Sequence, residues 1–448
     1  MLNRIIERTI TYIDNMPKKD RKKYGQFFTS KETARFMAGL YTISANRSKV
    51  CILDAGAGSG ILSYALLERL EQIDSIQIIE LTCYENDVHI LELLKENLQI
   101  YQVNSKKDIR VHIITDNYIT SQYLYFIFAA MGLFNLNNNG EMVYIIPRSW
   151  TSGAYFKRFR QYFLTEGKLE HIHLFVSRNK VFDKEDVLQE TIIIKVKKTN
   201  QIPKEVTITS SQSNKDFVNL TSLTVPYSLV VSGNDYYVYL VTNEKEISVL
   251  ERLRKFDKTL PDIGLKMKTG LTVDFRNPEI LRDDAEEGAI PLFYSQHIKE
   301  GEVHFPIQKE HEYIVTDHKG LIQDNHNYLF VKRFTAKEEH RRLQCGVYLS
   351  KRYPQYKKIS TQNKINLIDG LITEMSECLV YGLYVIFNSA LYDEYYRILN
   401  GSTQVNSTEI NAMPVPDLEI IQEMGKKMME SKDMSEENCN MILEGYCG

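Results

Sequence analysis

The sequence predicts an α/β fold, with a doubly wound, Rossmann-like sheet in the first half of the chain and an α+β domain in the second. Three observations support this prediction. Short apolar segments typical of strands alternate with helical segments between residues 50 and 196, which is the pattern of parallel βαβ units. Residues 199–240 are richer in Ser, Thr, Asn and Lys. Residues 241–418 then show short strands, isolated Gly and Pro turns and many aromatic residues.

Length and composition exclude several classes of protein. A chain of 448 residues is long enough for two or three domains, and its 43% hydrophobic and 25% charged residues exclude a disordered, collagen-like or coiled-coil protein. The net charge of -3 gives no overall support for a nucleic-acid partner. The chain has no apolar run of the ~20 residues that a membrane span needs, and no signal-peptide pattern. Its six scattered cysteines favour a reducing compartment and no bound metal, so we expect a cytoplasmic protein.

The expected elements follow in chain order. Residues 1–23 are expected to form an amphipathic helix that ends in a basic run, and a turn then precedes a helix over 31–40, which Thr29 or Ser30 can cap. Strands are expected at 50–53, 81–84, 111–114, 142–146, 171–175 and 191–196. Helices are expected at 61–70, 88–99, 124–134 and 153–164.

Four segments describe the expected domain organisation. They are a catalytic-type α/β domain over 1–200, a linker or extension of loops and short strands over 201–240, a second domain over 241–418 and a charged helical tail over 419–448. Within the second domain, helices are expected at 244–254 and 377–399.

A glycine-rich turn carries the main functional signal. Gly56, Gly58 and Gly60 follow the first strand and open a helix, so the backbone can approach a ligand closely and the helix amides are free to bind it. Glu85 ends the second strand, where a carboxylate accepts both hydroxyls of a ribose. Asp116 ends the third, where it can accept from an adenine amine. We infer a cofactor that contains adenosine; the alternative is an ordinary set of α/β turns with surface acids.

Both a dinucleotide and S-adenosylmethionine fit three such strand ends. Asp54, directly before the glycines, and the turn at 25–29 favour the methyl donor. With these features the chain resembles the adenine-specific DNA methyltransferases of type II restriction–modification systems, the PstI/BsuBI kind. The resemblance covers most of the chain and rests on blocks at 24–29, 53–60, 145–160, 173–190, 331–335 and 403–406.

The resemblance implies a set of site residues. The residues expected to bind S-adenosylmethionine are Thr29, Asp54, Gly56, Gly58, Gly60, Glu85, Asn86, Asp116 and Asn117. In the family, a phenylalanine at the position of Phe182 stacks on the adenine that has been flipped out of the duplex. The alternative for Phe182 is a core aromatic residue in a βα connection.

One motif of the resembled family is missing. Its members hold the target amine with Asn-Pro-Pro-Tyr at the end of the fourth strand, but this chain has no proline between Pro17 and Pro147. No strand pattern separates the third and fourth expected strands either, and a few tens of residues of the family pattern are lacking at the junction Thr120/Ser121. No catalytic residue is therefore visible.

Two explanations of this gap remain open. A true deletion would leave a relative that binds DNA or cofactor without catalysis. Alternatively, the active protein has a further segment at this junction that the present chain does not contain. The second is favoured, because loss of a central strand would expose the backbone and core of the strand that carries Asp54.

Local basic and polar residues are the candidates for DNA contact. Arg148, Lys332 and Arg333 lie inside family-like blocks and could neutralise phosphates, whereas Arg276, Gln296 and Gln404 have the reach to read base edges. Each of these six residues could instead belong to an ordinary solvent-exposed surface or stabilise a loop. The resemblance further implies double-stranded DNA as substrate and a separately encoded restriction endonuclease as partner, and we expect a monomer. A non-catalytic DNA-binding module, and a methyltransferase for RNA or a small molecule, are the alternatives.

Overall fold

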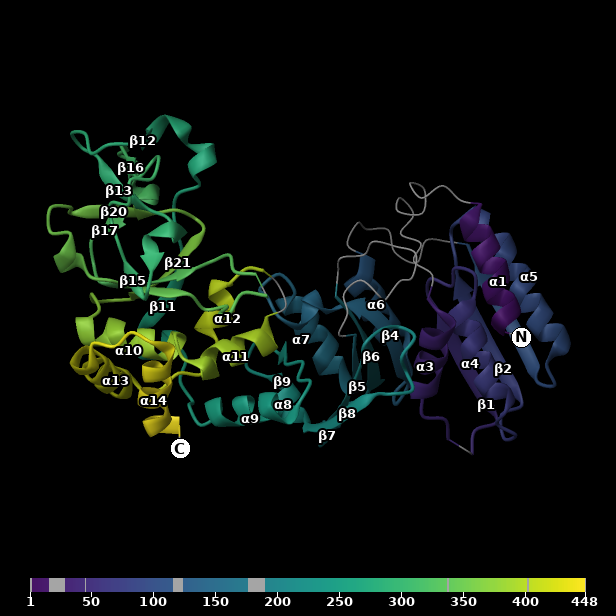
Figure 1. Ribbon diagram of the computed structural model, residues 1–448. Helices are drawn as coiled ribbons and strands as arrows, with labels where there is room; N and C mark the ends of the chain where they lie inside the picture. The colour runs from purple at the N-terminus through teal and green to yellow at the C-terminus, as the bar shows by residue number, and fades with distance from the viewer. Residues whose placement is uncertain are drawn as a thin grey trace. The chain divides into compact units, whose positions relative to one another are not determined.

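The computed structural model describes residues 2–15, 29–44, 46–115, 124–175, 190–336, 338–400 and 403–447 (Figure 1). The chain divides into two compact units. Unit 1 comprises Met1–Trp150 and Phe156–Tyr236, and unit 2 comprises Thr151–Tyr155 and Tyr237–Gly448.

The first sheet of unit 1 is parallel and has the strand order β1-β2-β3. Its strands are β1 (Lys49–Asp54), β2 (Ile78–Tyr84) and β3 (Asp108–Ile114), connected by α4 (Ile61–Glu71) and α5 (Val88–Asn104). Two helices precede this sheet, α1 (Leu2–Asp14) and α3 (Lys31–Leu40). The βαβ alternation that the sequence predicts is therefore present, and the three strands end at one edge.

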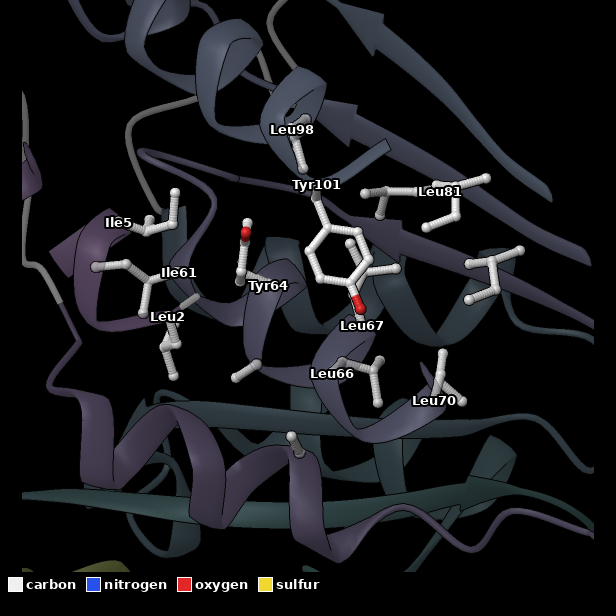
Figure 2. Close-up of a cluster of buried hydrophobic side chains, with 14 of the residues drawn as sticks. Leu2, Ile5, Ile61, Tyr64, Leu66, Leu67, Leu70, Leu81, Leu98 and Tyr101 are labelled. Carbon is white, nitrogen blue, oxygen red and sulfur yellow. The ribbon is translucent and has the colours of Figure 1, made fainter. Parts of the chain in front are cut away.

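A cluster of buried side chains holds these elements together (Figure 2). Leu2 and Ile5 of α1 meet α4, and Tyr64 of α4 meets Tyr101 of α5 edge to face, with ring centroids 4.7 Å apart. Full burial of one such side chain contributes roughly 1.5–3 kcal/mol. The cluster thus fixes α1 against the helices that follow β1 and β2.

The second sheet of unit 1 is mixed and has the order β4-β6-β5-β7-β8. Its strands are β4 (Glu141–Pro147), β5 (Gly167–Phe175), β6 (Thr191–Lys198), β7 (Glu205–Ser211) and β8 (Thr221–Pro226). Two helices belong to this region, α6 (Leu124–Asn135) and α7 (Lys157–Glu166). The segment expected to be a linker or extension with short strands, 201–240, contributes β7 and β8 and the short elements α8 (Tyr227–Val230), β9 (Val231–Ser232) and β10 (Tyr237–Val238).

Unit 2 contains two sheets and a set of helices. The six-stranded sheet has the order β11-β21-β18-β19-β15-β14, and the five-stranded sheet has the order β12-β16-β13-β20-β17. The strands are β11 (Leu265–Thr269), β12 (Leu281–Arg282), β13 (Ile290–Phe293), β14 (Ile298–Lys299), β15 (Glu302–Val303), β16 (Tyr313–Ile314), β17 (Gln323–Asp324), β18 (Tyr328–Lys332), β19 (Cys345–Tyr348), β20 (Lys358–Thr361) and β21 (Ile365–Gly370).

The helices of unit 2 are α9 (Glu244–Leu253), α10 (Glu377–Phe387), α11 (Ala390–Leu399), α12 (Ser407–Asn411), α13 (Leu418–Ser431) and α14 (Glu436–Cys447). The single helix expected over 377–399 is two helices, because the side chain of Ser389 caps α11 by accepting from the N–H of Tyr392. The expected helical tail is present as α13 and α14. Gly425 of α13 packs against the backbone of α10 so closely that a Cβ would collide with the carbonyl of Cys378.

Candidate functional site

The glycine-rich turn connects β1 to α4 in a conformation that needs glycine. Gly58 has a φ of 54° and Gly60, the residue before α4, a φ of 86°. The N–H of Ala57 donates to the carbonyl of Tyr84 at 3.0 Å, which fixes the turn to the end of β2. The turn is therefore a defined part of the sheet edge.

Replacing Gly60 by alanine is expected to destabilise the protein by about 1–2 kcal/mol, the cost of the left-handed conformation for a residue with a Cβ. A Cβ on Gly60 would also lie 3.0 Å from Cδ1 of Leu94. Urea unfolding measures the change. Gly39→Ala is the matched control, because Gly39 lies in helix α3 with nothing within 4 Å of its Cβ position and should gain about 0.5–1 kcal/mol. Equal effects of the two changes would contradict the role of Gly60.

Asp54 ties the turn to the first turns of α4. Its Oδ2 accepts from the hydroxyl of Ser63 at 2.6 Å. Burial raises the pKa of Asp54, while hydrogen bonds from Ser63 and from the N–H of Gly56 oppose the rise. The carboxylate therefore orders the backbone that begins the turn.

Glu85 lies beside the same turn, at the end of β2. Its Oε2 accepts from the N–H of Gly58 at 2.8 Å and its Oε1 from the N–H of Asp87 at 2.9 Å. Burial raises the pKa of Glu85, against these backbone hydrogen bonds. A carboxylate has about four acceptor positions, so Glu85 retains the capacity to accept from ribose hydroxyl groups.

Tyr12 of α1 is a further candidate that the sequence did not indicate. Burial, followed by the charges of Asp87 and Glu85, raises the pKa of Tyr12. Its hydroxyl is buried and has no hydrogen-bond partner among the described residues. A tyrosine in an amphipathic helix gives no sign of this position, because only the packing of α1 creates it.

Replacing Tyr12 by phenylalanine is expected to weaken binding of a ribose-containing ligand several-fold, about 1 kcal/mol for one hydrogen bond. Stability should not fall, since an unpaired hydroxyl is removed. Tyr64→Phe is the matched control, because the hydroxyl of Tyr64 is also buried without a described partner but belongs to the core cluster. Calorimetric titration of both variants with S-adenosylmethionine measures the effect, and equal losses would refute a role for Tyr12.

The structure places the remaining cofactor candidates unevenly. Asn86 is exposed next to Glu85, and Thr29 directly precedes Ser30, whose side chain caps α3 by accepting from Thr33. The other predictions, Asp116, Asn117, Phe182 and the junction Thr120/Ser121, lie outside the described residues. They remain predictions. The N–H of Glu85 donates to the carbonyl of Ile114 at 3.1 Å, so the end of β3 adjoins Glu85.

Three of the DNA-contact candidates come together in unit 2. The N–H of Val405 donates to the carbonyl of Arg333 at 2.7 Å, and Phe334 pairs with Gln404. The blocks at 331–335 and 403–406, some 70 residues apart in the sequence, are therefore neighbours. Lys332 and Arg333 are half-buried and Phe334 is exposed.

Arg276 lies in an adjoining loop. It is exposed beside the ring of Phe275, which is itself 74% exposed. The N–H of Asn363 donates to the carbonyl of Thr272 at 2.8 Å, and the guanidinium of Arg333 donates to the carbonyl of Asn363 at 3.0 Å. We call the group Arg276, Lys332, Arg333, Lys364 and Gln404 the basic patch.

The other two DNA candidates are placed differently. The guanidinium of Arg148 is half-buried and paired with Glu190 at 2.9 Å, so its charge is already compensated within unit 1. Gln296 is exposed in the 3-10 turn Ser295–His297.

Among the described residues, no group of three or more His, Cys, Asp and Glu side chains is arranged to hold a metal ion. In the same part of the chain, no helix is long and apolar enough to cross a bilayer. All six cysteines are free thiols.

Comparison with known proteins identifies the family. A glycine turn after a parallel strand, with an acid at the end of the next strand, is the arrangement of α/β domains that bind a nucleotide-containing cofactor. The family model of the Eco57I restriction-modification methylases matches residues 100–182. The type II methyltransferase M.PstI of Providencia stuartii is 31% identical over 463 residues, 91% of this chain and 90% of that protein. M.BsuBI of Bacillus subtilis is 31% identical over 467 residues, 92% and 91% of the two chains. The type IIL restriction-modification enzyme MmeI, solved in complex with DNA, gives a TM-score of 0.42 at 11% identity, over 90% of this chain and 67% of that chain.

The chain belongs to the family of type II methyltransferases of restriction–modification systems. It is a DNA methyltransferase, and its cofactor is S-adenosylmethionine.

The described residues fit this cofactor in two respects. Glu85 has acceptor capacity for the two ribose hydroxyls. The hydroxyl of Ser59, in the glycine turn, is buried without a partner in the described part of the chain, and a buried hydroxyl is normally hydrogen-bonded. Glu85, Ser59 and the backbone of Gly56–Gly60 are thus the residues that would hold the cofactor.

Proposed function

We propose that this protein transfers a methyl group from S-adenosylmethionine to the exocyclic amine of adenine in a specific sequence of double-stranded DNA. The observation that carries the proposal is the turn at Gly56–Gly60 hydrogen-bonded to Glu85 at 2.8 Å, in a chain of the type II methyltransferase family. Sequence blocks in both halves of the chain resemble those of the adenine-specific DNA methyltransferases, and this resemblance supports adenine as the target. The cofactor supplies the methyl group.

The residues of unit 1 have separate tasks in this proposal. Glu85 holds the ribose, and the glycines let the backbone approach the cofactor without side-chain interference. Asp54 keeps the turn in place through Ser63. Asp116 and Asn117 are proposed to contact the adenine of the cofactor, and Phe182 to stack on the flipped target base.

The basic patch of unit 2 is proposed to contact DNA. Its four cations, Arg276, Lys332, Arg333 and Lys364, can each neutralise a phosphate. Gln404 carries the amide group that suits base-edge readout. The backbone carbonyl of Gln404 accepts from the side-chain amide of Asn400 at 3.0 Å, which holds the loop in place. We further propose that the protein acts as a monomer and that a separately encoded restriction endonuclease recognises the same sequence.

Fluorescence anisotropy with a mixed-sequence DNA duplex tests the DNA partner. Arg333→Ala and Arg276→Ala are each expected to weaken binding and to lower the slope of log affinity against log salt by about 1. Lys426→Ala, an exposed change on α13, is the control and should leave both quantities unchanged. An RNA duplex of the same sequence that competes equally well would contradict DNA as the substrate.

A second candidate function is a catalytically inactive DNA-binding relative. The absence of Asn-Pro-Pro-Tyr from the chain favours it. It predicts that the protein binds both S-adenosylmethionine and duplex DNA, yet transfers no methyl group under any condition.

A further inference from the structure

The loop of residues 403–406 in unit 2 is fixed to its neighbours through its backbone. The N–H of Thr335 donates to the carbonyl of Thr403 at 3.1 Å. The side chain of Asn366, on β21, donates to the carbonyl of Val405 at 2.7 Å. These two contacts anchor the loop before and after its second residue.

The side chain of Gln404, that second residue, is turned toward the exposed side of the loop. Gln404 forms an antiparallel bridge with Phe334, and residues opposite each other in such a pair place their side chains on the same face. Phe334 is 45% exposed, whereas Val405 is fully buried. Since successive side chains point to opposite faces, Val405 anchors the loop in the core while Gln404 lies on the exposed side.

One buried hydroxyl, that of Tyr396 on α11, contacts the loop at two points. It donates toward the carbonyl of Gln404 at 3.1 Å and toward Oε2 of Glu409 at 3.0 Å, which share its single proton. It accepts from the N–H of Asn406 at 3.0 Å and from the side chain of Asn400 at 2.7 Å. A hydroxyl has one proton and two acceptor positions, so the contacts with the loop and its supports use its full capacity.

Glu409 on α12 holds this hydroxyl from the side away from the loop. Its side chain is fully buried, and a buried carboxylate needs hydrogen-bond partners. Oε2 accepts from Tyr396 and from the side chain of Asn400. Burial raises the pKa of Glu409, and hydrogen bonds, those from Asn400 and Tyr396 among them, oppose the rise. The position of the Tyr396 hydroxyl is therefore set by a packed polar network and not by the loop alone.

The ring of Tyr396 also connects to the neighbouring block of residues 331–335. The guanidinium of Arg342 lies 5.6 Å from the centroid of this ring. Nε of Arg342 donates to the hydroxyl of Thr335 at 3.2 Å. One buried side chain thus supports both segments that form the basic patch, the ring on one side and the hydroxyl on the other.

We propose that Tyr396 is a positioning residue for the recognition of a DNA sequence. Its hydroxyl fixes the backbone at Gln404 and Asn406, so that the side-chain amide of Gln404 meets the edge of one base pair in a single orientation. An amide discriminates between base edges through paired donor and acceptor contacts, and such contacts require a side chain that its surroundings hold in place. The inference rests on the proposed binding of duplex DNA by the basic patch, and it adds the residue through which one base pair is read.

Selection from a pool of DNA duplexes with a randomised central stretch tests the proposal. Sequencing of the bound and unbound duplexes gives the preference for each base at each position. Gln404→Ala is expected to lower the preference at one base pair by about tenfold or more, which identifies the position that Gln404 reads. Tyr396→Phe removes only the hydroxyl and keeps the ring beside Arg342. It should lower the preference at that same base pair by about threefold or more, the effect of one hydrogen bond.

Tyr392→Phe is the matched control. Tyr392 lies on the same helix, is fully buried like Tyr396, and donates its hydroxyl proton to the carbonyl of Pro414 at 2.8 Å, outside the loop. Urea unfolding should show a similar loss of stability in the two tyrosine variants, because each loses a buried hydroxyl that is hydrogen-bonded. The Tyr392→Phe variant should nevertheless select the same sequence as the natural chain, with the same preference at every position.

Three results would overturn the proposal while the natural chain still selects a sequence. They are an unchanged preference in Tyr396→Phe, an equal loss of preference in Tyr392→Phe, and a Gln404→Ala variant that keeps the preference at every position. A natural chain that binds no duplex from the pool would instead contradict the proposed function, and the inference with it. The selection measures binding and not methyl transfer, so the two failures are distinguishable.

Discussion

Replacing Glu85 by alanine is expected to weaken S-adenosylmethionine binding by about 100-fold. Each hydrogen bond from a ribose hydroxyl to the carboxylate contributes about 1.5–3 kcal/mol, and two of them give about 3 kcal/mol, or two factors of ten in affinity. The change also removes the acceptor of two backbone hydrogen bonds, which the N–H of Gly58 and the N–H of Asp87 donate to Glu85. The turn is thereby loosened, which adds to the loss. Isothermal titration calorimetry measures the affinity directly.

Glu80→Gln is the control for this variant. Glu80 lies on the same strand and forms an ion pair with Lys49 at 2.8 Å, away from the turn. Its replacement should leave the affinity for the cofactor within about twofold, since a surface ion pair contributes roughly 0–1 kcal/mol. A Glu85→Ala variant that binds as tightly as the Glu80→Gln variant would refute the assignment of the site.

Acidification from about pH 6.5 to 4.5 is expected to destabilise unit 1 through His173. Its Nδ1 lies 2.9 Å from Oγ1 of Thr209 and its Nε2 3.1 Å from Oγ of Ser211, in a fully buried position. Burial lowers the pKa of His173 from 6.5 to about 3. Between these values the unfolded chain binds a proton that the folded protein does not. Stability therefore falls as the pH falls, by about 1.4 kcal/mol per pH unit, or somewhat under 3 kcal/mol over the range.

Urea unfolding of the His173→Gln variant at both pH values checks this expectation. Glutamine retains polar contacts with Thr209 and Ser211 but has no titrating group, so the variant should lose about 2–3 kcal/mol less on acidification than the natural chain. His112→Gln, an exposed change on β3, should keep the full pH dependence. An unchanged pH dependence in His173→Gln would show that other groups cause the acid sensitivity. His171, whose pKa burial lowers to about 4, is the next group to replace.

The local parts of the site were predictable from the sequence. The apolar runs before Asp54 and Glu85 place both residues at strand ends, and consecutive parallel strands put those ends at the same edge. The spacing of Gly56, Gly58 and Gly60 predicts the turn, because glycine readily adopts the positive φ angles that a tight turn needs. The fold class follows from the alternation of strand and helix segments in the sequence, and the structure confirms it.

Features that depend on packing between distant segments were not predictable. The hydroxyl of Tyr12 is buried only in the folded protein, where Leu2 and Ile5 of the same helix pack in the core. The side-chain ion pair of Arg148 with Glu190 forms between two residues that are distant in the sequence. Their backbones are held together by a hydrogen bond from the N–H of Arg148 to the carbonyl of Glu190. Strand β8 has a largely exposed, polar sequence, so its segment has the composition of a loop although it pairs with β7.

The measurement that tests the account most directly is the identity of the methylated base. Labelled S-adenosylmethionine is incubated with duplex DNA of mixed sequence, and the DNA is digested to nucleosides and separated. The reaction is performed with the protein and with its Glu85→Ala variant. We expect label in N6-methyladenine with the protein and none with the variant. Label in a cytosine product, or no label from a protein that binds both the cofactor and the duplex, would contradict the proposed function.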